Sequence, residues 1–486
     1  MRRRARATTM DAASPREARR ERLRAAGIFA WVVAAHLTWL AGDLLWNRPI
    51  SPLFAGDALH FVEAARHLAS GERLGAGLPL HPPAMAWLLT PLWWIFGAPE
   101  RVFVASKVMM VTLNAATWTA TYWLLRVRAP FAGVVCLLGP LAFGELLLSS
   151  AANSEAPYRL LLAALLLVGT RWPALGGALH AAAALTRAEH LLAMAVGAVV
   201  VAIRRPALRR WVAWTLLSAL VALAPWELAA RADLRDYNRR FASELAEPLP
   251  EWVPISFYGP LNFALAQREE GIHFSRQTLP PGAAGRAELD PTVPEHHRLV
   301  VDGYRVGLAE IAARPGRFLV RAGEKLAYSL RALGGGWTWR DLPKTAPWVR
   351  QPVDLAAAPA PLWGLFSLAL AGLGAWSLRA DRALVAAIAA LVAYRLAVNV
   401  VFFPYLRSMM IAAPAFLALF WSGWQPLARA ATRRTLTAAL VALALVHFSS
   451  GWRTRRYLLA GERDARGVIL DDRPVVVKYA GRYESP

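Results

Sequence analysis

A short polar stretch around Asp57 holds residues whose types could do chemistry, because it places a carboxylate close to two histidines. From Asp57 the pattern predicts an amphipathic helix that ends at Gly71, with Asp57, His60 and His67 on one face. A carboxylate held in this way could accept a proton from a substrate, and the three side chains could also hold a metal ion. Asp57 could equally be a helix cap, since aspartate is favoured at helix N-termini. The spacing alone leaves these interpretations open.

Further acidic and basic residues stand where one apolar run ends and the next begins. Glu155 is either a charge at a helix start or a partner for Asp57. Arg187 and Glu189 lie in the segment LTRAEH between two apolar runs. Ionisable side chains at membrane depth are costly and often functional, but these two could also simply pair with each other.

Three more cations flank apolar runs, namely Arg101, Lys107 and Arg407. Long basic side chains that reach toward a membrane interface would explain them, and so would binding of a phosphate. The chain has no phosphate-binding loop, dinucleotide fingerprint, HExxH motif or CxxC pair, so nucleotide chemistry has no recognisable site. Its one cysteine, Cys136, excludes a disulfide framework.

The elements that must position these residues are apolar helices. Of the 486 residues, 56% are hydrophobic and only 18% are charged. Residues 27–46, 102–125, 211–230 and 383–401 are runs of about 20 residues, the length of a helix that crosses a ~30 Å hydrocarbon core. The net charge of +22 comes mainly from arginines clustered between apolar runs, which is typical of cytoplasmic links in membrane proteins and argues against nucleic-acid binding. The sequence therefore predicts an all-α polytopic membrane protein.

The Arg-rich links indicate a topology. Apolar runs are found at 27–46, 80–97, 102–125, 130–148, 156–170, 173–186, 188–203, 211–230, 361–378, 383–401, 408–424 and 435–450. If run 80–97, which begins at His81-Pro82-Pro83, lies at the interface rather than crossing, every short Arg-rich link falls on the cytoplasmic side. This predicts eleven spanning helices, a cytoplasmic N-terminus and an outward-opening site.

The predicted organisation follows from these runs. We expect a basic cytoplasmic N-terminus at 1–26, and an N-terminal membrane module at 27–230 with an external loop at 47–101. We also expect an external, periplasmic domain at 231–358, C-terminal membrane helices at 359–450 and an external polar tail at 451–486, with a strand near 474–479.

Several short motifs occur in an order that resembles a known superfamily. They are Gly56-Asp57, ARHLASG at 65–71, His81-Pro82-Pro83, Arg101, Ser154-Glu155, LTRAE at 185–189 and Pro404-Tyr405-Leu406-Arg407 with Pro414. Together they resemble the GT-C superfamily of glycosyltransferases, which use polyprenyl-phosphate sugars. The most similar members are the protein O-mannosyltransferases, the lipid A aminoarabinose transferase and the rhizobial core-oligosaccharide transferases. Ala188 stands where those relatives have proline, and no second acid adjoins Asp57.

The resemblance implies a GT-C fold with an interfacial helix pair in the first external loop and a small mixed external domain. It implies inverting transfer of a sugar from a polyprenyl-phosphate donor to a lipid, glycan or protein acceptor at the outer face of a bacterial inner membrane. Asp57 would be the base and Glu155 a second acid. The donor phosphate would be bound by Arg187, Arg101, Lys107 and Arg407, with His60, Glu63, His81 and Glu189 in support.

Two points stay open at this stage. Some relatives use a divalent metal such as Mg²⁺ or Mn²⁺, for which Asp57 and Glu155 would be the ligands. A glycolipid transporter or a non-catalytic scaffold for envelope assembly would also be a polytopic membrane protein, although a transporter is expected to show internal repeats.

Overall fold

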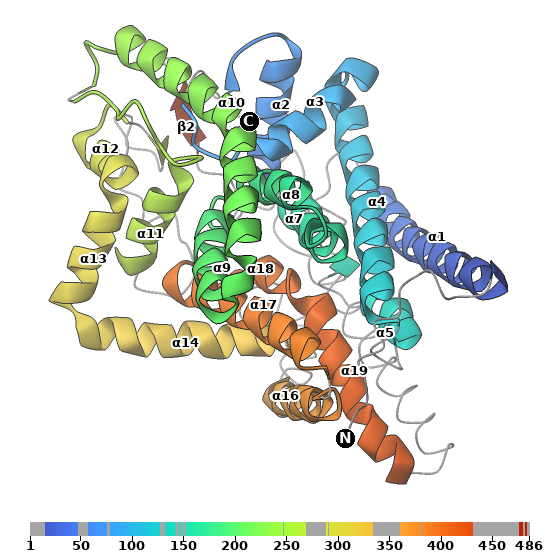
Figure 1. Ribbon diagram of the computed structural model, residues 1–486. Coiled ribbons are helices and arrows are strands. Elements are labelled where there is room, and N and C mark those ends of the chain that lie inside the picture. Colours follow the sequence, from blue (N-terminus) through green and yellow to red (C-terminus); the bar gives the residue numbers. More distant parts are fainter. Residues whose placement is uncertain are drawn as a thin grey trace, which may run out of the picture.

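The computed structural model describes residues 15–46, 57–74, 78–126, 132–141, 145–146, 148, 152–245, 247–268, 288–289, 291–333, 360–379, 381–430, 476–479 and 482–483. This part of the chain is predominantly helical (Figure 1). Three of its helical segments are long and apolar enough to cross a membrane: Pro15–Ala41, Pro206–Arg240 and Leu384–Val401. Shorter apolar helices are Ala84–Phe96, Ala132–Leu141, His190–Arg204, Ser367–Ser377 and Ala413–Gly423. The chain thus has the helices expected of a membrane protein.

The N-terminal half contains α1 (Pro15–Trp46), α2 (Asp57–Ala69), α3 (Ala84–Phe96), α4 (Pro99–Leu125), α5 (Ala132–Leu138), the 3₁₀ turn η4 (Gly139–Leu141), α7 (Glu155–Ala164), the π-helical turn η5 (Leu165–Gly169), α8 (Pro173–Thr186), α9 (His190–Arg204), the 3₁₀ turn η6 (Pro206–Leu208) and α10 (Arg209–Arg240). The predicted helix that starts at Asp57 is α2. Its end is followed by Gly71, whose φ of 80° lies in the left-handed region.

The short helices α2 and α3 pack against each other. The indole N–H of Trp93 donates to the Val62 carbonyl at 3.0 Å, and that of Trp94 donates to the Ala69 carbonyl at 3.2 Å. At 13 residues, α3 is about 20 Å long, too short to cross a hydrocarbon core. The helices α8 and α9, at 14 and 15 residues, are of similar length, so helix length alone does not separate α3 from the runs that are predicted to span.

Two N-terminal runs differ from the predicted helices. Within 130–148, α5 ends at Leu138 and a 3₁₀ turn follows, because Pro140 has no N–H to donate and its ring clashes with a preceding carbonyl. In contrast, α10 continues ten residues beyond the predicted end at Ala230, and an ion pair between Asp236 and Arg240 at 2.9 Å supports its last turn.

The C-terminal half contains α11 (Tyr258–Arg268), β1 (Glu288–Leu289), α12 (Pro294–Val301), α13 (Gly303–Ala313), α14 (Pro315–Leu333), α16 (Ala360–Ser377), α17 (Arg382–Val401), α18 (Leu406–Met410), α19 (Ala413–Ala430), β2 (Val476–Tyr479) and β3 (Arg482–Tyr483). The apolar run 435–450 lies outside the described residues. Figure 1 shows α11, α12 and α13 to one side of α9 and α10, with α14 running from them toward α17.

The expected mixed domain at 231–358 is helical in its described part, apart from β1. That strand pairs in parallel with β2, which pairs antiparallel with β3. A core of Leu261, Leu265, Leu299 and Val306 holds α11, α12 and α13 together, so helix packing organises this region.

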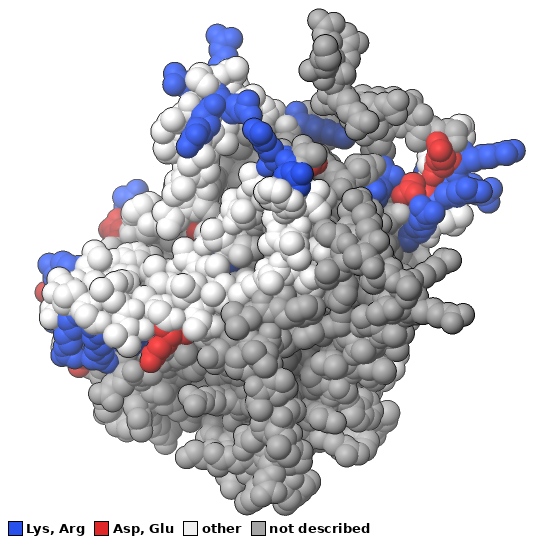
Figure 2. Space-filling model, turned by 90° about the horizontal axis from the view of Figure 1, so that it is seen from below, with Lys and Arg blue, Asp and Glu red and all other residues white. Residues whose placement is uncertain are grey.

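Much of the described surface is apolar. Leu192, Ile203, Leu220 and Val221 on α9 and α10 are each more than 60% exposed. Among the described residues on the face drawn in Figure 2, charged side chains stand in separate clusters beside stretches of uncharged surface. Exposed apolar surface of this extent fits contact with lipid.

Candidate active site

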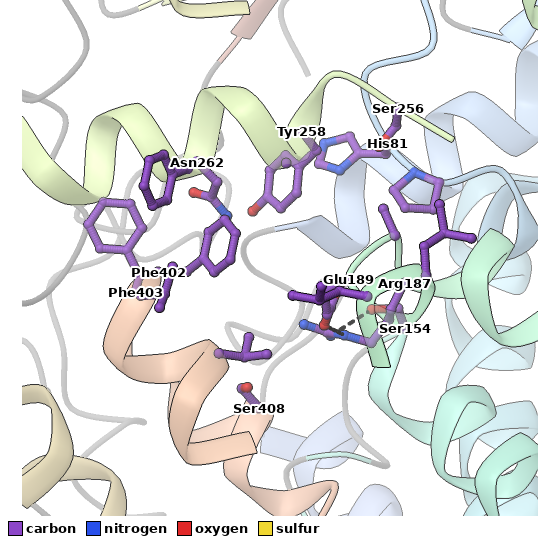
Figure 3. A pocket seen from close by; sticks show the side chains of 18 of the residues that line it. His81, Ser154, Arg187, Glu189, Ser256, Tyr258, Asn262, Phe402, Phe403 and Ser408 are labelled. Carbon is purple, nitrogen blue, oxygen red and sulfur yellow. Dashed lines mark hydrogen bonds and ion pairs between the residues drawn. The ribbon is translucent and has the colours of Figure 1, made fainter. Parts of the chain in front are cut away.

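A cavity of about 540 Å³ lies where α2, the α8–α9 link, α11 and α17 meet (Figure 3). Its wall is mainly apolar and aromatic, and includes Phe61, Leu191, Leu192, Tyr258, Phe263, Tyr304, Tyr394, Val398, Phe402, Phe403 and Tyr405. The charged residues on this wall are Asp57, Arg187, Glu189 and Arg407, all predicted from sequence. An apolar cavity with a few convergent charged groups is the usual form of a small-molecule or lipid site.

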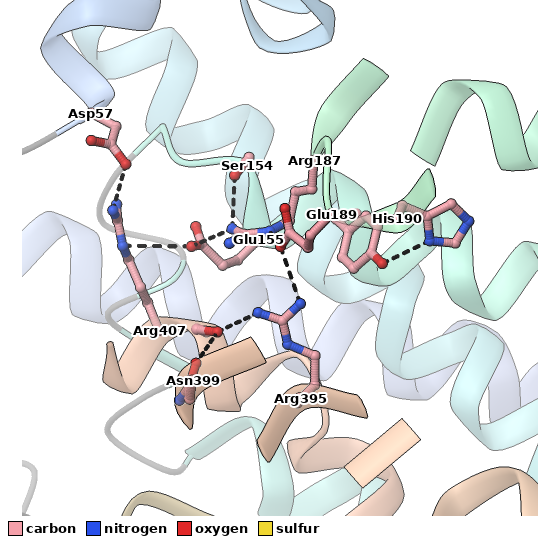
Figure 4. Close-up of polar contacts among 11 residues, drawn as sticks. Asp57, Ser154, Glu155, Arg187, Glu189, His190, Arg395, Asn399 and Arg407 are labelled. Carbon is pink, nitrogen blue, oxygen red and sulfur yellow. Dashed lines mark hydrogen bonds and ion pairs between the residues drawn. The ribbon is translucent and has the colours of Figure 1, made fainter. Parts of the chain in front are cut away.

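Asp57 and Arg407 meet at this cavity although 350 residues separate them in the chain. The Arg407 guanidinium donates from Nη2 to Asp57 Oδ2 at 2.5 Å, and its Nε lies 3.5 Å from Glu155 Oε1 (Figure 4). The side chains of Asp57 and Arg407 are each about a quarter exposed. Asp57 is the first residue of α2, so its carboxylate lies at the positive end of the helix dipole as well as at the cavity.

Glu155 continues this line of charges into the protein. Its Oε1 accepts from Arg187 Nη1 at 2.7 Å, and Arg187 Nε donates to Glu189 Oε1 at 2.6 Å. Arg187 also donates to the Ser154 hydroxyl at 3.0 Å. Arg187 lies between α8 and α9, where its extended backbone ends α8. This conformation turns its guanidinium toward α7.

The line ends at Arg395, a fully buried residue of α17 that sequence reasoning missed. Its Nη1 donates to Glu189 Oε1 at 3.2 Å, and its Nη2 donates to the Ser408 hydroxyl. Ser408 in turn donates to Asn399 at 2.7 Å. A single arginine inside the apolar run 383–401 is itself a signal, because a charge within a spanning helix is seldom retained without a role.

The charges around Asp57 set its protonation state. Burial would raise the pKa of Asp57, but the guanidinium of Arg407, together with His81 and His60, outweighs burial and lowers this pKa to about 2. Burial lowers the pKa of His81 to about 4, so its ring is neutral near pH 7. The Asp57 carboxylate is therefore ionised, as a base must be, but it accepts a proton poorly while Arg407 holds it.

Imidazole and aromatic rings pack together near Asp57. The His81 ring lies 4.6 Å from that of Tyr258 and 5.5 Å from that of His60, between ring centroids. Tyr258 follows Ile255, whose φ of 65° is unusual for a β-branched residue. Trp226 donates to the Ile255 carbonyl at 3.1 Å and so holds this turn beside the cavity. The sequence carried no signal for this turn.

Some predicted site residues lie elsewhere. Arg101 is exposed on α4, and Lys107 is buried within the same helix; neither lines the cavity. Glu63 is exposed and pairs with Arg66. Of the supporting residues, His81 and Glu189 line the cavity, and His60 contacts it through the His81 ring.

The acids of the site face arginines rather than one another. Arg407 lies between Asp57 and Glu155, so the two carboxylates that would be metal ligands are bridged by a cation. His67 lies within 3.5 Å of Glu63 and 2.6 Å of Glu72, apart from Asp57. Within the described ranges, no group of three or more His, Cys, Asp or Glu side chains could hold a metal ion.

The arrangement offers three chemical capacities: a carboxylate that is ionised, guanidinium groups that can bind an anion, and an apolar wall that can hold a hydrocarbon. Guanidinium groups bind phosphate through paired hydrogen bonds, and such bonds are stronger in a site of low water content. No protein-family model matches this chain, and neither does any curated protein sequence.

Proposed function

We propose that this protein is a membrane glycosyltransferase that moves a sugar from a polyprenyl phosphate to an acceptor hydroxyl. The observation that carries the proposal is the meeting of Asp57 with Arg407 and Arg187 at one largely apolar cavity. A hydroxyl acceptor needs a base, a phosphate leaving group needs cations, and a polyprenyl chain needs an apolar surface. These three needs match the groups that converge there.

The proposed architecture is a GT-C fold with eleven spanning helices in a bacterial inner membrane. The N-terminus would lie in the cytoplasm, and the cavity would open toward the periplasm. The packed pair α2 and α3 would lie at the outer interface, because only then do the short Arg-rich links all fall on the cytoplasmic side. The Arg-rich links around Arg205 and Arg379 support the orientation.

In the proposed reaction, the acceptor oxygen bonds to the anomeric carbon from the face opposite the phosphate. The bond between that carbon and the phosphate oxygen breaks, and its electron pair leaves with the phosphate. Asp57 takes the hydroxyl proton and later releases it to water. The departing phosphate changes from a diester to a monoester and gains negative charge, which Arg407 and Arg187 would stabilise as it develops.

The lipid part of the donor has a candidate path along α9. Leu191 and Leu192 line the cavity, and Val196, Val199 and Val200 continue an exposed apolar face along the helix. A polyprenyl chain laid on this face would keep its phosphate at the cavity. The acceptor hydroxyl would then approach along the part of the cavity wall formed by Asp57 and His81.

The test is transfer of radiolabelled sugar from polyprenyl-phosphate sugars to acceptors in membranes that contain the protein. We expect Asp57→Asn to abolish transfer, because an amide takes no proton, while membrane abundance stays unchanged. The matched control is Glu251→Gln, since Glu251 is an exposed acid that pairs with Arg235 away from the cavity. Full transfer by Asp57→Asn would refute the base, and lipid translocation without new glycosidic bonds would favour a transporter.

A further inference from the structure

The charges of the site cancel in the structure. Asp57, Glu155 and Glu189 alternate with Arg407, Arg187 and Arg395, so that each arginine contacts one or two carboxylates. An incoming phosphate therefore meets no arginine that is without a carboxylate in this set. Since three carboxylates already balance the three arginines, an added phosphate would leave excess negative charge in the site, and this favours displacement of a carboxylate from one of the arginines.

Exposure and contacts identify which pair opens. The Arg407 and Asp57 side chains are 26% and 25% exposed, and those of Arg187 and Glu189 are 17% and 20% exposed, whereas Glu155 is 2% exposed and Arg395 is fully buried. Arg187 is held by close contacts to Ser154, Glu155 and Glu189. Besides Asp57, the acid near Arg407 is Glu155, at 3.5 Å. The Asp57–Arg407 pair is thus the link that a ligand in the cavity reaches first.

We infer that the phosphate of the lipid donor displaces Asp57 from Arg407, so that the carboxylate becomes available for the acceptor only when the donor is bound. This inference rests on the proposed function. Asp57 begins α2 and Arg407 lies on α18, and the Arg407 side chain has several rotatable bonds, so rotamer changes can separate the two groups. The donor therefore binds before the acceptor. While the donor is absent, Asp57 stays paired with Arg407 and is not available to activate water.

A measurable consequence is competition between the carboxylate and the lipid phosphate for one guanidinium. Removal of the carboxylate should strengthen binding of the lipid phosphate even though transfer is lost. General repulsion between two anions would also strengthen binding, but that effect does not need Arg407. The two explanations therefore differ when Arg407 is absent.

The experiment measures the Kd of undecaprenyl monophosphate for the full-length protein in nanodiscs, with wild type, Asp57→Asn, Arg407→Gln and the double variant. We expect Asp57→Asn to tighten binding roughly tenfold, which corresponds to 1.4 kcal/mol. In the Arg407→Gln background, the same substitution should leave Kd nearly unchanged. Glu251→Gln, which removes an acid outside the cavity, should leave it unchanged in both backgrounds.

Two results would overturn the inference while the proposed function stands: no tightening by Asp57→Asn, or equal tightening with and without Arg407. If Arg407→Gln does not fold, Arg407→Lys takes its place, and the gain on loss of Asp57 must again be smaller than in the protein with Arg407. If neither wild type nor Asp57→Asn binds the lipid phosphate, the proposed function itself fails and the inference falls with it.

Discussion

At the scale of single residues, Arg395 shows how a charge is kept inside an apolar helix. Its guanidinium is fully buried in α17 and contacts Glu189 and Ser408. Because Glu189 also binds Arg187, Arg395 fixes the innermost part of the charged site from a helix that is long and apolar enough to span a membrane. We therefore regard Arg395 as a positioning residue for Arg187.

Arg395→Met should destabilise the protein by about 3 kcal/mol, since removal of one partner of a buried ion pair leaves the other partly uncompensated. The measurement is the free energy of unfolding in detergent, with the Kd of undecaprenyl phosphate as a second readout. Arg382→Met is the control, because Arg382 is exposed at the start of the same helix. Equal stability of both variants would contradict the role assigned to Arg395, and Arg395→Lys should recover part of the loss.

The sequence predicted several residues that meet at the cavity or directly behind its wall, because acids and arginines at helix ends are visible as interruptions of apolar runs. Asp57, Glu155, Arg187 and Arg407 are of this kind. Spacing does not show which side of a helix faces the cavity, so Lys107, buried within α4, could not be separated from them. The catalytic roles of these residues stay predictions.

At the scale of elements, α16 and α19 cross with their backbones in close contact. A Cβ at Gly374 would lie 1.8 Å from the Leu419 carbonyl oxygen, and one at Gly423 would lie 2.0 Å from that of Leu370. Only glycine permits this approach, which is how helices in membranes gain packing contact without a hydrophobic driving force. The crossing lies on the other side of α17 from the cavity's α9 wall and holds the C-terminal helices together.

Gly374→Leu should separate α16 from α19 and lower the free energy of unfolding by about 1–3 kcal/mol, as expected for an overpacked contact. The control is Gly372→Leu, because a Cβ at Gly372 meets nothing within 4 Å. Thermal unfolding in detergent measures both variants. A fall of the same size for Gly372→Leu would show that leucine itself, and not the crossing, is responsible.

Element boundaries were predictable where apolar runs end in charge or proline. The predicted range 173–186 is that of α8, and the predicted range 383–401 differs from α17 by one residue. The break in α5 was harder to foresee, because Gly139 and Pro140 stand inside an apolar run. Close packing of Gly139 on the Trp118 ring accompanies the break, and such a contact between distant segments has no local sequence signal.

At the scale of the whole molecule, the orientation of α10 can be tested with introduced cysteines. The helix has 32 residues and is about 48 Å long, more than the ~30 Å of a hydrocarbon core. In intact cells, a membrane-impermeant maleimide should label Arg239→Cys, and it should label Leu208→Cys only after permeabilisation. The protein without an introduced cysteine is the control, because its native Cys136 is buried and should not be labelled. Labelling of both positions from outside would contradict a spanning α10, and the reverse pattern would contradict the orientation.

The alternating charges also constrain how the protein is made. Glu155, Arg187 and Glu189 leave the ribosome more than 200 residues before Arg395 and Arg407. Until α17 and α18 follow, Glu189 lacks one of its two arginines and Asp57 lacks its partner. The nascent N-terminal helices therefore carry uncompensated charge through most of synthesis. Completion of the site coincides with arrival of the C-terminal helices, so a chain that ends before residue 395 leaves Glu189 without Arg395 and Asp57 without Arg407.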